Sequence, residues 1–208
     1  MKKTIISLLA ALLASTAIFA QTPQEIIARM DQETNRFDKE GLSVTMELKL
    51  PLLGSFATDI QMLGDKYKMT ADIKGNKAIN WSDSVTDWQY DVQKNEITIS
   101  RSKPSEKSDP ENNMKMLDSV TEGYDVKLKS ETDQAWYFVC TKSKSNTKKD
   151  DPKRMDLVIS KATYLPISVQ AKEKGVTITM RNFAVGVKEK DITFNPADYP
   201  SAKIIDNR

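Results

Sequence analysis

The strongest constraint on the fold is an alternation of apolar and polar side chains between Leu42 and Leu50. Every even position in this stretch is apolar, and every odd position is polar or charged. Since successive side chains of a strand point to opposite faces, the pattern predicts a β-strand with one packed face and one wet face. Similar short segments recur along the chain. They predict strands at 42–50, 56–62, 67–73, 78–81, 88–92, 97–99, 124–129, 135–142, 155–161, 165–172, 176–182 and 192–194.

Short turns such as Gly64-Asp65 and Gly75-Asn76 separate many of these strands, which favours antiparallel pairing of consecutive strands. About eleven antiparallel strands in one domain have to close into a barrel, stack as a sandwich or curl. A curled sheet has a concave apolar face that needs a cover. Short helices would cover it without filling it, and a cavity would remain.

Two helices are predicted. The first covers about 23–38, where Thr22 is a suitable N-cap, Pro23 occupies the first turn and Gly41 ends the helix. The second is a short helix that starts at Asp109-Pro110 and stops at Gly123. Its apolar side is formed by Met114, Leu117 and Val120, and we expect these residues to form a lid.

The first twenty residues have the pattern of a secretory signal peptide. Lys2 and Lys3 precede a short apolar segment, and Ala20 is a suitable residue for cleavage. The alternative, a membrane anchor, is less well supported because the apolar segment is short. Gln21, rather than a cysteine, follows the cleavage position. We therefore expect a free periplasmic protein with a single domain at 21–208.

Charge and composition argue against several functions. Without Lys2 and Lys3, the 31 basic residues fall to the number of acidic residues, 29, which does not favour nucleic-acid binding. The chain contains no histidine, so the common general base and the commonest zinc ligand are missing. Cys140 is the single cysteine, and its apolar neighbours predict a buried strand residue. We expect neither an enzyme nor a metal site.

The acidic and basic clusters are interpreted as solvated turns and loops. Asp83 with Asp87 and Asp150 with Asp151 are expected to be turn or loop acids rather than catalytic or calcium-binding groups. The Lys-rich segment 141–154 is expected to be a long hairpin tip. A docking surface for an anionic partner is the alternative for that segment.

The apolar strand faces are the candidate binding surface. Ordinary core packing explains any one of them, but nine methionines are a reason to consider a surface that adapts to varied apolar ligands. The predicted cavity residues are Val44, Met46, Leu48, Ile60, Met62, Met69, Ile73, Trp88, Tyr90, Ile97 and Ile99. A register error of one residue would reverse the assigned face of any strand.

Three segments, taken in order, resemble the LolA-type periplasmic lipoprotein carriers, in their Bacteroidetes-like branch. The first is the leader followed by a helix of the type 26–31 and an alternating strand. The second is Gly64-Asp65-Lys66-Tyr67-Lys68-Met69, followed by Trp88-Gln89-Tyr90-Asp91 and 95–99. The third is the tail 194–200, which ends in 204–208. The order covers essentially the whole chain after residue 20.

The resemblance implies a mainly β fold: a half-open curved antiparallel β-barrel of about eleven strands, with helices as a lid over a hydrophobic cavity. It also implies a monomeric chaperone without a cofactor that carries acylated lipoproteins from an inner-membrane lipoprotein-releasing transporter to an outer-membrane acceptor where one exists. In better-known carriers an arginine early in the barrel holds the lid shut. Lys68 stands where several relatives have arginine, and lysine lacks the planar fork of a guanidinium.

Two rival functions remain from the sequence. An envelope regulatory module of the same fold would bind a protein partner or free lipid, and it would need no large cavity. An enzyme is the second rival, and a close pair of buried carboxylates in a cleft would favour it.

Overall fold

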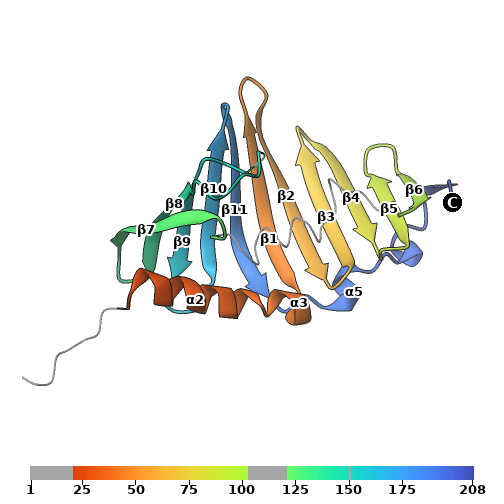
Figure 1. The fold of residues 1–208 in the computed structure, drawn as a ribbon. Helices are drawn as coiled ribbons and strands as arrows, with labels where there is room; N and C mark the ends of the chain where they lie inside the picture. The colour runs from red at the N-terminus through yellow and green to blue at the C-terminus, as the bar shows by residue number, and fades with distance from the viewer. Residues whose placement is uncertain (1–20, 103–120, 150) are drawn as a thin grey trace, which may run out of the picture.

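The structure is a computed structural model that describes residues 21–102, 121–149 and 151–208. Its strands form a single curved, open sheet in the order β12-β6-β5-β4-β3-β2-β1-β11-β10-β9-β8-β7 (Figure 1). The predicted mainly β, curved fold is confirmed. The strands are β1 (Leu42–Leu50), β2 (Gly54–Leu63), β3 (Lys66–Ile73), β4 (Asn76–Ser82), β5 (Thr86–Asp91), β6 (Glu96–Arg101), β7 (Tyr124–Glu131), β8 (Ala135–Lys142), β9 (Arg154–Ser160), β10 (Pro166–Glu173), β11 (Val176–Val185) and β12 (Lys203–Asp206).

Two features of the sheet differ from the sequence prediction. The segment 192–194 is not a strand, because α5 (Glu189–Ile192) ends there and leads into an extended tail. The last strand is instead β12, which pairs parallel with β6. All other pairs of neighbouring strands are antiparallel. The tail supplies this strand because the 3-10 helix η1 (Pro196–Asp198) and the turn after it bring the chain back to the sheet edge.

The predicted N-terminal helix is present as two pieces, α2 (Pro23–Thr34) and α3 (Phe37–Glu40). Thr22 caps α2 as predicted: its hydroxyl accepts from the Glu25 N–H, and the Glu25 carboxylate accepts from the Thr22 N–H. Gly41 ends α3 with a positive φ of 78°. A Cβ at this position would lie 2.7 Å from the Met62 carbonyl oxygen, so the bend into β1 requires glycine.

The main core lies between α2 and one face of the sheet, which we call the helix face. Ile26 and Met30 of α2 are fully buried against side chains of β1 and of strands β8 to β11. Cys140 belongs to this core as predicted, and burial raises the pKa of its thiol to about 11. The buried core residues are Ile26, Met30, Phe37, Leu42, Val44, Trp136, Phe138, Cys140, Met155, Leu157, Ile159, Val169 and Met180.

A second packed region lies on the opposite face, which we call the tail face. The segment after α5 crosses this face over β4 and β5, where Phe194 and Tyr199 pack against Trp81, Trp88 and Tyr90. The ring centroids in these contacts lie 4.7 to 5.7 Å apart. The tail therefore covers the half of the sheet that α2 does not reach.

No helix in the described part of the chain is long and apolar enough to cross a membrane. The predicted leader and the predicted lid residues Met114, Leu117 and Val120 lie outside the described residues.

Candidate functional site

The strand register divides the predicted cavity residues between the two faces of the sheet. Residues directly opposite on neighbouring strands share a face. Leu48 pairs with Phe56, and Ile60 pairs with Met69, so the apolar stripes of β1, β2 and β3 lie on the helix face. The helix-face members of the predicted set are Val44, Met46, Leu48, Ile60, Met62, Met69 and Ile73.

The remaining four predicted residues lie on the tail face. Trp81 pairs with Lys68 on one side and with Trp88 on the other, and Trp88 pairs with Ile99. Trp88, Tyr90, Ile97 and Ile99 therefore lie on the opposite side of the sheet from the seven helix-face residues. There Trp88 and Tyr90 contact the aromatic rings of the tail.

The apolar side of the sheet therefore changes between β3 and β4. On the helix face, Met69 of β3 is followed by Asn80 of β4 and Gln89 of β5. The sequence contained a signal for this change. Lys74 and Gly75 form a two-residue turn between the paired residues Ile73 and Asn76, and counting across that turn places Trp81 and Trp88 on the opposite face from Met69.

The candidate site is a stripe of half-buried apolar side chains on the helix face. It begins at Met46 and Ile60, which pack against the main core, and it continues past that core. In β1, Leu42 is 1% exposed and Val44 3%, whereas Met46, Leu48 and Leu50 are only half-buried. In β2 and β11 the helix-face side chains also change from buried to half-buried toward the β1–β2 and β10–β11 turns. We call this stripe the apolar track; it consists of Met46, Leu48, Leu50, Phe56, Ile60, Met69, Val176 and Ile178.

A cavity of about 680 Å³ opens beside α2 on the β7 side of the core. Its apolar lining includes Ile27 and Val126, and its polar lining includes Asp31. Asp31 Oδ1 is buried and has no hydrogen-bond partner among the described residues, and burial raises the pKa of this carboxyl above its ordinary value. The cavity is therefore a mixed surface rather than a purely apolar one.

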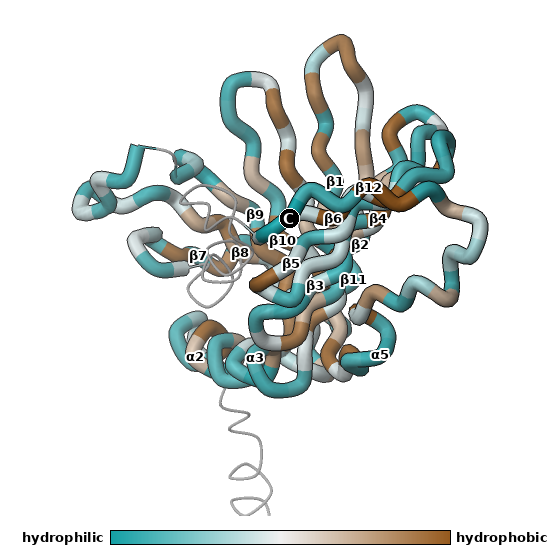
Figure 2. Tube along the Cα trace, turned by 90° about the vertical axis from the view of Figure 1, so that its right-hand side faces the viewer, coloured by the Kyte–Doolittle hydropathy of each residue, from teal (hydrophilic) through white to brown (hydrophobic). Residues whose placement is uncertain are grey.

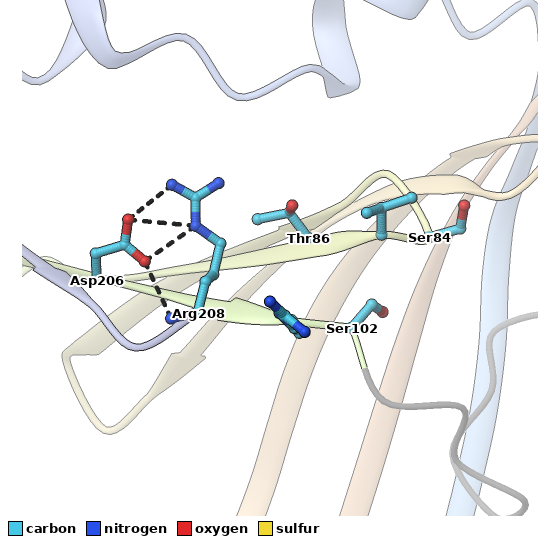
Figure 3. A pocket seen from close by; sticks show the side chains of 7 residues that line it. Ser84, Thr86, Ser102, Asp206 and Arg208 are labelled. Carbon is cyan, nitrogen blue, oxygen red and sulfur yellow. Dashed lines mark hydrogen bonds and ion pairs between the residues drawn. The ribbon is translucent and has the colours of Figure 1, made fainter.

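Two further pockets lie around the tail. One, of about 810 Å³, lies where β12 joins the sheet edge, and Figure 3 shows the Asp206–Arg208 ion pair beside Thr86 and Ser102. The ion pair lowers the pKa of Asp206 to about 2 through hydrogen bonds from Arg208. The other, of about 280 Å³, lies between the tail and the tail face and includes Lys68.

Lys68 has a different environment from the one that a lid latch requires. Its ammonium lies 5.9 Å from the centroid of the Trp81 ring on the tail face. The helix face is on the other side of the sheet, so Lys68 does not face the apolar track. Position 68 therefore cannot hold a cover over that track.

The acidic pair Asp83 and Asp87 has structural roles in a turn and between strands, whereas Asp150 of the second predicted pair lies outside the described residues. The Asp83 carboxylate accepts from the N–H groups of Val85 and Thr86, and it closes the turn between β4 and β5. The Asp87 carboxylate accepts from the hydroxyls of Ser82 and Ser102. Within the described residues, no group of three or more His, Cys, Asp or Glu side chains is placed to hold a metal ion.

Comparison with known proteins yields matches to solved structures alone. No protein family and no curated protein matches the sequence. LprF from Mycobacterium bovis is 12% identical, with a TM-score of 0.49 over 85% of this chain and 99% of LprF. A LolA superfamily protein from Nitrosomonas europaea is 10% identical, with a TM-score of 0.34 over 84% of this chain and 99% of that one.

A chain of the Pseudomonas aeruginosa MucA/MucB complex is also similar, at 13% identity and a TM-score of 0.44. The match covers 82% of the present chain and 60% of that chain. All three TM-scores lie below 0.5. The function is therefore inferred from the residues of the protein itself.

Proposed function

We propose that this protein is a periplasmic carrier that binds the acyl chains of lipoproteins on the helix face of its sheet and carries them from the inner to the outer membrane. One observation carries the proposal: the apolar track continues past the packed core with its side chains half-buried. A stripe that served only the core would be buried along its whole length. Half-buried apolar side chains in a continuous row are typical of a surface that a ligand completes.

The physical need for such a carrier follows from the hydrophobic effect. Each methylene group moved from water into an apolar site gains about 0.8 kcal/mol, so a free acyl chain is costly to keep in an aqueous compartment. Met46 and Met69 suit this task, because flexible methionine side chains adapt to acyl chains of different length and position.

The polar half of the helix face fits the rest of an acylated protein. Asn80 and Gln89 continue the same face from Met69 toward the β12 side of the sheet. We infer that acyl chains lie along the apolar track while the attached polypeptide lies toward these polar side chains. The chemistry of binding then requires no cofactor, only apolar burial beside hydrogen-bonding groups.

The predicted leader would deliver the chain to the periplasm after cleavage at Ala20. An inner-membrane lipoprotein-releasing transporter would then supply the acylated lipoprotein, and an outer-membrane acceptor, where one exists, would receive it. These localisation and partner assignments rest on the leader pattern and on the resemblance of the three sequence segments to LolA-type carriers.

The experiment that tests the proposal is native mass spectrometry of the protein purified from the periplasm of its native host, with lipid extraction of the same sample. The carrier should co-purify with acylated protein or lipid. A protein free of both, which also fails to take up a fluorescent fatty-acyl probe, would contradict the proposal. Such a result would favour the envelope regulatory module, whose partner is a protein.

A further inference from the structure

Because neighbouring strands are antiparallel, the connections between several strand pairs lie at the same end of the strands. In Figure 1 the β1–β2, β3–β4 and β10–β11 connections all lie at the edge away from α2 and α3. The tips of β1–β2 and β10–β11 are also in contact, since a Cβ on Gly175 would lie 3.1 Å from Pro51 Cγ. We call this edge the hairpin edge.

The β1–β2 tip presents two leucines to solvent. Leu52 is 105% exposed and Leu53 is 55% exposed. In Figure 2 this tip is the tallest hairpin and is coloured as hydrophobic. Ile73, at the neighbouring β3–β4 tip, is 49% exposed. Three large aliphatic side chains on one edge therefore contribute little to the packing of the fold.

Leu52 is also held in an unfavourable backbone conformation. Its φ is 66°, in the left-handed region that glycine and asparagine adopt more readily than a leucine does. The fold therefore gains neither burial nor backbone relaxation from a leucine at this position. A residue that costs the fold stability in two ways indicates a role outside the fold.

Lysines surround these apolar tips. Lys49, Lys74, Lys172 and Lys174 are exposed, and none of them forms a salt bridge within the described residues. Lys74 and Lys174 are turn residues with positive φ, next to Ile73 and beside the β1–β2 tip.

The acids of this edge largely serve local contacts. The Asp72 carboxylate accepts from the Gly75 N–H, and Asp91 pairs with Lys94 at the β5–β6 tip. Glu173, next to Lys174, is half-buried. Asp72 is exposed and keeps its charge, but the four exposed lysines outnumber it at these tips, so the hairpin edge has a positive surface.

We propose that the hairpin edge docks on the surface of a bilayer that contains anionic lipids. Leu52 and Leu53 enter the boundary between headgroups and acyl chains, while Lys74 and Lys174 lie among the phosphates. Protruding aliphatic side chains combined with basic residues are the two signals that together hold a protein at an anionic membrane. A single narrow tip reaches into a fluid lipid layer more readily than it fills a pocket of matching shape on a protein.

The inference stands on the hairpin edge alone and does not require the proposed carrier function. If both hold, they share a geometry, because the apolar stripe of β1 and β2 leads from the core to the tip that meets the bilayer. An acyl chain would then pass between membrane and track without crossing open water.

The test is vesicle flotation of the chain from Gln21 onward. One set of vesicles contains phosphatidylcholine alone, and the other contains about one quarter phosphatidylglycerol. The wild type should float with the anionic vesicles, and the binding should weaken as salt is raised. The double variant L52N/L53S should bind the anionic vesicles at least about tenfold more weakly than the wild type, because it removes the inserted apolar groups. K74E/K174E should lose binding to the anionic vesicles.

Two control variants match these changes at the opposite edge of the sheet. Val85→Ser alters an exposed aliphatic residue of the β4–β5 turn, and Lys39→Glu reverses a charge on α3. Both should bind vesicles as the wild type does. Weaker vesicle binding should not arise from misfolding, because asparagine suits the positive φ of position 52. The L52N single variant should therefore resist urea at least as well as the wild type.

A wild type that binds neither set of vesicles would overturn the proposal, and so would equal binding by the wild type and L52N/L53S. Vesicle binding that requires an added membrane protein would overturn it in favour of a protein partner. Uptake of a soluble fatty-acyl probe separates this proposal from the carrier function, because L52N/L53S should still take up the probe. Vesicle binding without probe uptake would uphold docking and contradict the carrier.

Discussion

Leu48 of β1 lies directly opposite Ile178 of β11 on the helix face, and both side chains are half-buried. One pair closer to α2, Met46 lies opposite Met180, which is buried in the main core. The packed core therefore ends between these two successive residue pairs of β1 and β11. Beyond it the apolar surface of the described residues continues with side chains that are only half-buried.

The stability of the protein should be sensitive to the core and tolerant of changes along the track. Leu157→Ala removes a fully buried side chain and should lower the free energy of unfolding by about 2–5 kcal/mol. Leu48→Ala removes the same atoms from a half-buried site and should cost about 1 kcal/mol. Urea unfolding of both variants checks the contrast. Equal losses would mean that Leu48 belongs to the packed core.

The aromatic tail should stabilise the β4–β5 half of the sheet without contributing to ligand binding. Phe194→Ala removes ring contacts with Trp81, Trp88 and Tyr199, and it should cost about 2–4 kcal/mol. Binding of a fatty-acyl probe should be unchanged, because the tail packs on the face opposite the apolar track. A variant that keeps its stability but loses probe binding would place the site on the tail face.

Asp31 should make the protein less stable as pH rises. Burial raises the pKa of its carboxyl in the folded state above the unfolded value, so its contribution to stability is fully present below the unfolded pKa. That contribution is lost as pH rises through the raised folded-state pKa. Asp31→Asn should therefore be more stable than the wild type at neutral pH.

The advantage of Asp31→Asn should vanish in acid, where the aspartic acid of the wild type is also neutral. Urea unfolding of both proteins across this pH range measures the difference. Asp38→Asn, which changes an exposed acid of α3, is the matched control and should show no such dependence. An advantage that is independent of pH would show that the gain does not come from removing the charge.

Local pattern predicted most of the fold. The alternation of 42–50 and the short turns located nearly all of the strands, and the caps at Thr22 and Gly41 located the start and end of the helical segment. These features are encoded within a few residues of one another. The predicted burial of Cys140 was also correct, because its neighbours form a strand that is apolar on one face.

The arrangement of the candidate site was less predictable, because it depends on contacts between distant segments. Alternation shows that Trp88 and Tyr90 share a face, but not which face, and that choice depends on the register across the Lys74-Gly75 turn. The role of Phe194 and Tyr199 follows from the long return of the tail across the sheet, which no local pattern encodes. The apolar track itself becomes visible only where burial by α2 ends.

The most direct test of the central claim is the affinity of a fluorescent fatty-acyl probe for two variants that carry a charge on opposite faces. Leu48→Lys places the charge in the apolar track, and Val158→Lys places it at a half-buried position on the other face of β9. The account predicts that the first variant loses probe binding and that the second binds as the wild type does, with both folded by circular dichroism. Undiminished binding to Leu48→Lys would contradict the account.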